Sequence, residues 1–94
     1  MTLRIFLNGF GRIGRTITRM VLRDHPDIEI AGINDIAPLE TCAYLFAYDS
    51  VFGPLPGGAE GRDGALLAGG RRIPFSHAPD ISALDLGGVD IVME

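Results

Sequence analysis

The sequence predicts an α/β fold that contains an incomplete doubly wound parallel sheet, with the element order β-α-β-α-(small β)-β. One observation behind this prediction is a set of short, mainly apolar runs at residues 4–7, 28–34 and 89–93, which indicate strands. The first of them is typical of a strand buried on both faces of a parallel sheet. Another is the helical periodicity of the segments that follow the first two runs. Strands that alternate with helices pair in parallel through right-handed crossovers.

The first helix is predicted to begin at Arg12 and to end within Asp24-His25-Pro26-Asp27, because Pro26 cannot continue it. Its apolar residues recur at i, i+4, i+7 and i+8 as one stripe, which we expect to face the core: Ile13, Ile17, Met20 and Val21. Another face carries a row of like charges: Arg12, Arg15, Arg19 and Arg23. Such a row costs a little free energy in isolation, so we expect it to meet water, acids or a ligand.

A second helix is predicted from about Leu39 to Tyr48. Its apolar face is formed by Leu39, Ala43 and Phe46. Cys42 lies beside this face among apolar neighbours and without a base, so we expect it to pack in the core rather than to act as a nucleophile.

The rest of the chain predicts short strands and turns. Residues 49–70 are rich in glycine and proline, and the runs at 65–68 and 71–75 indicate a hairpin across the Gly69-Gly70 turn. Pro74 predicts that this hairpin lies at a sheet edge. Residues 79–88 indicate a turn or one short helical stretch before the last strand.

The composition of the 94 residues indicates one small globular domain. Eight Arg and no Lys stand against 12 acids, and the net charge of -4 argues against a nucleic-acid partner. No uncharged stretch approaches the ~20 apolar residues of a membrane span, and no secretory signal is present, so we expect a cytoplasmic protein. The single cysteine excludes an internal disulfide and a cysteine-rich metal site.

A glycine motif joins the first strand to the first helix. It fits G-x-G-x-x-G: Gly9, Phe10, Gly11, Arg12, Ile13 and Gly14. Its position after a strand and before a helix is the context of a dinucleotide-binding loop of the Rossmann type. Gly9 permits the tight turn, Gly11 lets the backbone approach a pyrophosphate, and Gly14 allows close helix–strand packing. The helix N-terminus then offers N–H groups and a positive dipole end to the phosphates. The alternative is a glycine turn that binds nothing.

Asp35 follows the second strand, 21 residues after Gly14. Its carboxylate is placed to accept the two ribose hydroxyls of an adenosine, and its charge repels a 2′-phosphate, which favours NAD over NADP. The alternative is a capping residue before Pro38. Asn8 is placed to brace the glycine loop through side-chain hydrogen bonds, or it serves as a simple turn former.

Three segments resemble the glyceraldehyde-3-phosphate dehydrogenase family in their order and spacing: Asn8-Gly9-Phe10-Gly11-Arg12-Ile13-Gly14-Arg15, Ile33-Asn34-Asp35 and Tyr48-Asp49-Ser50. The similarity runs over essentially all of the chain. It implies a phosphorylating aldehyde dehydrogenase of carbohydrate metabolism such as glycolysis. In that reaction a Cys thiolate attacks a sugar-phosphate aldehyde, a His acts as base, hydride passes to NAD and phosphate releases the acyl group. It also implies a homotetramer in the complete enzyme.

By the same resemblance, the backbone at Arg12-Ile13 contacts the pyrophosphate, Asp35 binds the adenosine ribose, and His77 stands near the adenine. The family's catalytic Cys and His and its substrate domain are expected beyond Glu94. No catalytic residue is therefore assigned here. Residues 1–94 are expected to be the N-terminal portion of a dinucleotide-binding domain and to be inactive alone.

One departure from the family pattern is Val51-Phe52, where the family commonly has Thr-His, so we expect that loop to differ in packing or subunit contacts. Other readings stay open. They are an erythrose-4-phosphate dehydrogenase, which usually has Glu in place of Asp35, another Rossmann NAD(P) oxidoreductase, and a non-enzymatic nucleotide-binding module.

Overall fold

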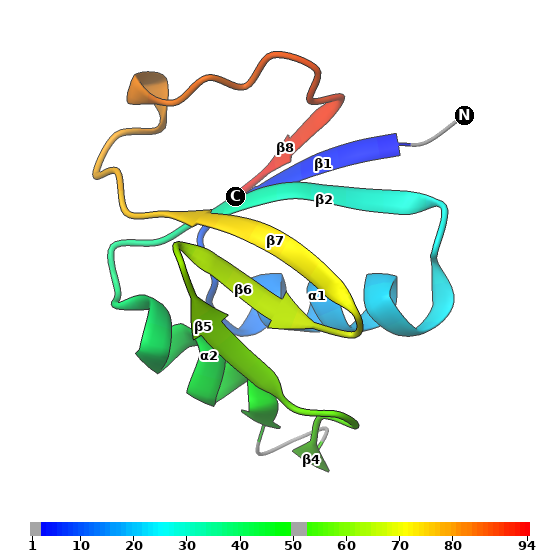
Figure 1. Ribbon diagram of the computed structural model, residues 1–94. Helices are drawn as coiled ribbons and strands as arrows, with labels where there is room; N and C mark the ends of the chain where they lie inside the picture. Colours follow the sequence, from blue (N-terminus) through cyan, green and yellow to red (C-terminus); the bar gives the residue numbers. More distant parts are fainter. Residues whose placement is uncertain (1–2, 50–52) are drawn as a thin grey trace.

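The computed structural model, which describes residues 3–49 and 53–94, contains a six-stranded sheet in the order β5-β6-β7-β2-β1-β8. The strands are β1 (Leu3–Asn8), β2 (Ile28–Asn34), β5 (Ala59–Arg62), β6 (Ala65–Ala68), β7 (Arg71–Ser76) and β8 (Ile91–Met93). β1 pairs in parallel with β2 and β8, and β2 pairs in parallel with β7. β6 pairs antiparallel with β5 and β7, so the sheet as a whole is mixed. The predicted parallel pairing of β1, β2 and β8 and the predicted element order are confirmed (Figure 1).

Two helices cover one face of this sheet (Figure 1). Helix α1 spans Arg12–Asp24 and α2 spans Leu39–Ala47. The predicted apolar face of α2 is confirmed, because Leu39, Ala43 and Phe46 are all buried in the core cluster. Cys42 is buried beside them, as expected.

The apolar stripe predicted for α1 is only half right. Val21 is buried and Ile17 is partly buried against the core, but Ile13 is 74% exposed and Met20 is 46% exposed. The helix is turned so that Thr18 faces the core in their place, fully buried. Its hydroxyl donates to the Gly14 carbonyl at 2.9 Å, which satisfies the polar group within the helix itself.

The row of Arg residues on α1 does not face solvent throughout. The Arg19 guanidinium donates to the carbonyls of Phe46 and Gly53, each at 2.8 Å, and lies 5.6 Å from the Phe46 ring centroid. It thereby ties α1 to the segment that holds the short strands β3 (Tyr48–Asp49) and β4 (Gly53–Pro54). Ser50, Val51 and Phe52, where the loop was expected to differ, lie outside the described residues.

The hairpin of β6 and β7 forms across Gly69-Gly70 as predicted, with positive φ angles of 58° and 76° that suit glycine in a two-residue turn. The prediction that Pro74 marks a sheet edge is wrong, since β7 lies between β6 and β2. Pro74 is tolerated because the β2 pairing begins only at Phe75. The Phe75 N–H donates toward β6, to the Gly64 carbonyl, so the missing N–H of Pro74 faces the unpaired side.

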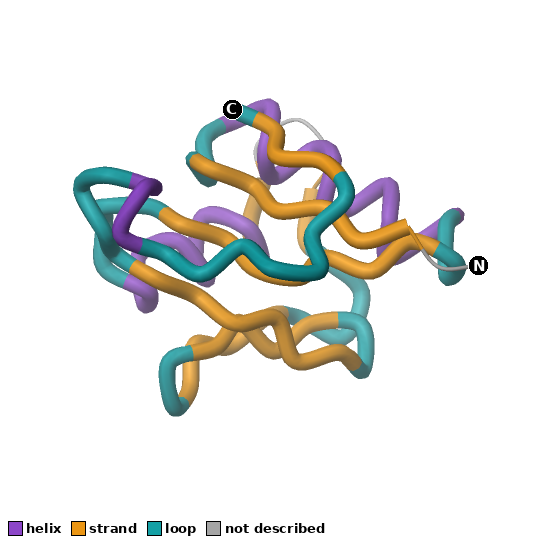
Figure 2. The backbone as a smooth tube through the Cα atoms, turned by 90° about the horizontal axis from the view of Figure 1, so that it is seen from above, coloured by secondary structure: helices purple, strands orange, loops and turns teal. Residues whose placement is uncertain are grey.

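Residues 77–90 run along the sheet on the side opposite the helices and include one 3-10 turn, Ile81–Ala83 (Figures 1 and 2).

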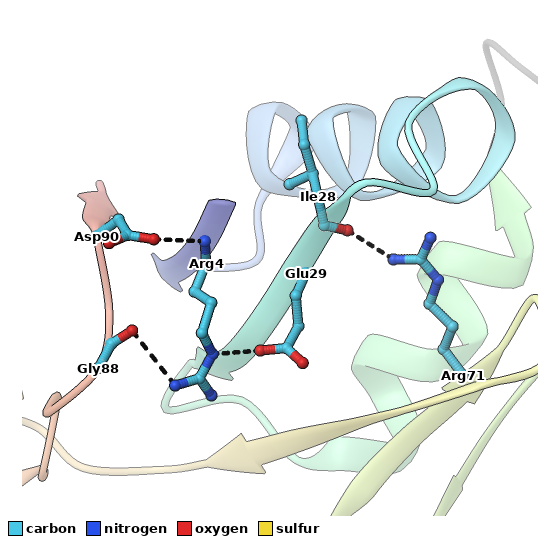
Figure 3. Close-up of polar contacts among 6 residues, drawn as sticks. All are labelled: Arg4, Ile28, Glu29, Arg71, Gly88 and Asp90. Carbon is cyan, nitrogen blue, oxygen red and sulfur yellow. Dashed lines mark hydrogen bonds and ion pairs between the residues drawn. The ribbon is translucent and has the colours of Figure 1, made fainter. Parts of the chain in front are cut away.

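Polar contacts join the amino ends of neighbouring strands (Figure 3). Arg4 pairs with Glu29 on β2 and donates to the Gly88 carbonyl at 3.3 Å. The backbone N–H of Arg4 donates to the Asp90 carboxylate at 2.8 Å, and the Asp90 N–H donates to the Arg4 carbonyl at 2.8 Å. Arg71 donates to the carbonyl of Ile28 at 2.9 Å. The bonds of Arg4 to Gly88 and Asp90 hold β8 beside β1, and the bond of Arg71 to Ile28 joins β7 to β2.

Candidate functional site

The carboxyl ends of the parallel strands meet at one edge of the sheet, and we call this the carboxyl edge. The glycine loop follows β1, Asp35 follows β2 and His77 follows β7. Ligands of doubly wound sheets bind in the crevice outside this edge. The fold therefore brings together candidate residues from three separate parts of the sequence.

The structure requires glycine at two of the three positions in the loop, Gly9 and Gly14, and leaves the third open. Gly9 has φ +116°, a conformation that L side chains rarely adopt. A Cβ on Gly14 would lie 2.6 Å from the Gly9 carbonyl oxygen, so the loop packs against the helix only without one. A Cβ on Gly11 would meet nothing within 4 Å, and its φ of -79° is ordinary. The protein itself places no demand on Gly11, which leaves the space above it free for a ligand.

The start of α1 has the properties of an anion site. Gly11 is the N-cap residue, no side chain caps the helix, and its first turn carries no acid. The N–H groups of the first turn have no partner within the helix, and the dipole makes this end positive. Arg12 is exposed at the same place. A cleft of about 380 Å³ opens here between the loop and the end of β8; its lining includes Gly9, Gly11, Arg12, Ile13, Met93 and Glu94. The exposed Ile13 side chain forms part of the lining of this cleft.

Asp35 links the ends of β1 and β2. Its Oδ2 accepts the backbone N–H of Phe10 at 2.8 Å, and its Oδ1 accepts that of Ala37 at 2.9 Å. The bond to Ala37 closes a turn before α2, whose N-cap residue is Pro38 and which has no side-chain cap, so the alternative of a helix-capping Asp35 is wrong. The bond to Phe10 was not foreseen and holds the glycine loop against the acid. A carboxylate has about four lone-pair sites, so it retains acceptor capacity for hydroxyl donors.

Phe10 enters the site through its backbone alone. Its side chain is buried and packs against Phe46 and Phe75, with ring centroids 5.5 Å and 6.0 Å away. The Phe10 side chain thus anchors the glycine loop in the core, while the Phe10 backbone N–H faces Asp35.

His77 and Asn8 border the site on two sides. The His77 Nδ1 atom lies 2.8 Å from the Asp35 carbonyl oxygen, and the exposed ring is tilted against Phe75. The Asn8 amide bonds to Glu94 Oε1 at 3.0 Å and, through its oxygen, to Asn34 at 3.1 Å. Asn8 therefore braces the strand ends beside the glycine loop rather than the loop itself.

Two residues of this edge were not predicted from the sequence. Asn34 and Ser76 are hydrogen-bonded to each other at 2.7 Å, and Asn34 is buried. The available signal was that each is a polar residue at the carboxyl end of a strand, but the partners depend on strand register.

Cys42 lies in the core behind the loop. Burial raises the pKa of its thiol, and the negative charge of Asp35 acts in the same direction, whereas Arg15 acts in the opposite one. The thiol is therefore held protonated, which is the reverse of what a nucleophile needs.

Within residues 3–49 and 53–94, no three His, Cys, Asp or Glu side chains are grouped as metal ligands, and no helix is long and apolar enough to cross a membrane.

A glycine loop between a parallel strand and a helix, with an acid at the end of the next strand, defines a Rossmann-type dinucleotide-binding domain. Comparison with known proteins specifies it further. The family model described as "Glyceraldehyde 3-phosphate dehydrogenase, NAD binding domain" matches residues 3–94. The chain belongs to this family, and its cofactor is NAD.

Individual relatives agree with this assignment. Glyceraldehyde-3-phosphate dehydrogenase 1 of Streptomyces arenae is 43% identical over 96 residues, covering 100% of this chain and 29% of the relative. The Thermotoga maritima enzyme is 44% identical over 95 residues, covering 97% of this chain and 28% of the relative. The Haemophilus influenzae enzyme is 42% identical over 96 residues, covering 100% of this chain and 28% of the relative. The chain thus spans less than a third of the length of these relatives.

Proposed function

We propose that NAD lies along the carboxyl edge with its pyrophosphate over the glycine loop. The observation that carries this proposal is the open position above Gly11 at the uncapped start of α1. The backbone N–H groups of the first turn of α1, at Arg12 and Ile13, donate to the phosphate oxygens, and the helix dipole stabilises their charge. Asn8 and Gly9 border the same cleft.

The adenosine half lies toward Asp35 and His77 in this arrangement. Asp35 accepts the ribose hydroxyls while it keeps its bond to the Phe10 N–H. A 2′-phosphate would place a second negative charge beside this carboxylate, so NADP is disfavoured. His77, fixed against the Asp35 carbonyl, borders the adenine.

In a longer protein of the relatives' length, this segment serves a phosphorylating glyceraldehyde-3-phosphate dehydrogenase in which NAD accepts hydride. We infer that residues 1–94 are the N-terminal portion of its cofactor domain, and that the catalytic thiol, the base and the sugar-phosphate site belong to other segments. The complete enzyme is proposed to be a cytoplasmic homotetramer. The buried, protonated Cys42 takes no part in the reaction.

Two assays on the 94-residue chain test this proposal. Without a reactive thiol there is no covalent adduct from which hydride can leave, so we expect no phosphate-dependent NAD reduction with glyceraldehyde 3-phosphate. Measurable turnover by the pure chain would refute the assignment of catalysis to other segments. In calorimetric titrations we expect NAD to bind with an affinity around millimolar (about 4 kcal/mol) and NADP more weakly. Equal affinity for the two would contradict the role given to Asp35.

A further inference from the structure

Three neighbouring strands end in polar side chains at matching register positions. Asn8 ends β1, Asn34 ends β2 and Ser76 ends β7, and Asn34 is the register partner of both others. We call these three residues the polar row. It crosses the carboxyl edge directly beneath the proposed NAD site.

Asn34 is the centre of the polar row. It is 4% exposed, and its amide uses every donor and acceptor it has. Nδ2 donates to Asn8 Oδ1 at 3.1 Å and to the Ala78 carbonyl at 2.9 Å. Oδ1 accepts from Ser76 Oγ at 2.7 Å and from the Ala78 N–H at 2.8 Å. A buried polar group satisfied in this way rigidifies its surroundings, whereas a partly satisfied one is costly.

The backbone around Asn34 extends this control to both halves of the site. The Gly9 N–H donates to the Asn34 carbonyl at 2.7 Å, which sets the start of the glycine loop. The Asp35 N–H donates to the Ser76 carbonyl at 3.0 Å, which sets the position of the acid. The two hydrogen bonds between the Asn34 side chain and the Ala78 backbone hold the segment that carries His77.

We propose that Asn34 is a positioning residue for NAD, which fixes the adenosine side of the site relative to the phosphate loop. This inference rests on the proposed function, because it assumes that NAD spans both. Only an amide supplies two donors and two acceptors here. An Asp of the same shape accepts but cannot donate, so it would face the Asn8 and Ala78 oxygens without a proton to offer.

The test compares two ligands, NAD and inorganic pyrophosphate, because pyrophosphate needs the loop but not the adenosine side. In Asn34→Asp the added negative charge lowers the affinity for both ligands. Misplacement of the adenosine side, in contrast, lowers the affinity for NAD alone. We expect the ratio of NAD affinity to pyrophosphate affinity to fall about tenfold in Asn34→Asp and about threefold in Ser76→Ala, which loses one hydrogen bond of the row. Ile73→Val, a conservative change at a buried position of β7 away from the row, is the control and should leave the ratio unchanged.

An unchanged ratio in folded Asn34→Asp and Ser76→Ala would overturn the inference, and Ser76→Ala decides alone if Asn34→Asp does not fold. If the parent chain binds no NAD, the proposed function fails instead. Amide hydrogen exchange measured without ligand then tests the positioning: the Gly9 and Asp35 amides, whose bonds to Asn34 and Ser76 set the loop and the acid, should exchange faster in the row variants, relative to Leu66 in β6. Equal relative exchange would refute it.

Discussion

Replacing Gly11 by Val should abolish NAD binding while leaving the fold intact. The backbone at Gly11 has an ordinary φ of -79°, and a Cβ there would meet no atom within 4 Å. The core residues Thr18 and Val21 of the same helix are remote from the change. The new side chain instead occupies the space where a pyrophosphate must approach the first N–H groups of α1.

The size of each effect follows from these contacts. Val is a poorer N-cap than Gly, but it lowers the entropy of the unfolded chain, so the net change in unfolding free energy should stay within about 1 kcal/mol. Each lost hydrogen bond from a backbone N–H to a charged phosphate is worth about 1.5–3 kcal/mol, a roughly tenfold to 150-fold loss of affinity. A parent dissociation constant of about 1 mM then rises to about 10–150 mM for each lost bond.

Gly14→Ala is the matched contrast, because its Cβ would lie 2.6 Å from the Gly9 carbonyl oxygen. Overpacking of this kind typically costs about 1–3 kcal/mol of stability. Urea unfolding and calorimetric titration with NAD should therefore separate the two variants: Gly11→Val loses binding and Gly14→Ala loses stability first. Undiminished NAD binding by Gly11→Val would show that this loop is not the phosphate site.

Other substitutions test other parts of the account. Asp35→Ala should weaken NAD binding by about 1–3 kcal/mol and reduce the preference of the protein for NAD over NADP. Unchanged NAD binding in a calorimetric titration would show that Asp35 only holds the glycine loop and the turn. Arg19→Ala should lower the unfolding free energy by about 1–3 kcal/mol, whereas exposed Arg23→Ala should change it by less than about 0.5. Equal effects in urea titrations would deny the Arg19 tether. Burial raises the pKa of Cys42 above its ordinary value of 9.0, so the unfolded chain loses this proton first and stability falls as the pH rises past that value. Unfolding at pH 8 and pH 10 should show a steeper loss in the parent than in Cys42→Ala, and identical slopes would contradict it.

Local patterns were sufficient to predict the elements of this fold. The bounds of α1, the hairpin across Gly69-Gly70 and the buried face of α2 all follow from periodicity and turn chemistry within a few residues. The rotation of α1 about its axis does not. Periodicity places Ile13 and Met20 on one stripe, but which side of the stripe meets the sheet depends on the packing of Thr18 and Val21.

Long-range contacts account for what the sequence did not predict at the site. Arg19 bonds to carbonyls 27 and 34 residues away, so its partners cannot be read from its own helix. Asn34 acquires its role only when β1 and β7 lie in register on either side of β2. The glycine motif, by contrast, is local, and the steric roles of Gly9 and Gly14 were predicted from its spacing.

The location of NAD at the carboxyl edge is tested most directly by an amide NMR titration of the ¹⁵N-labelled 94-residue chain with NAD. We expect the largest shifts at Gly9, Gly11, Arg12 and Ile13, with smaller shifts at Asp35 and His77. A second cleft lies between α1 and Leu55 and is lined by Thr16, Met20 and Pro56. Shifts confined to that cleft, or the same shifts undiminished in Gly11→Val, would contradict the location of NAD at the carboxyl edge.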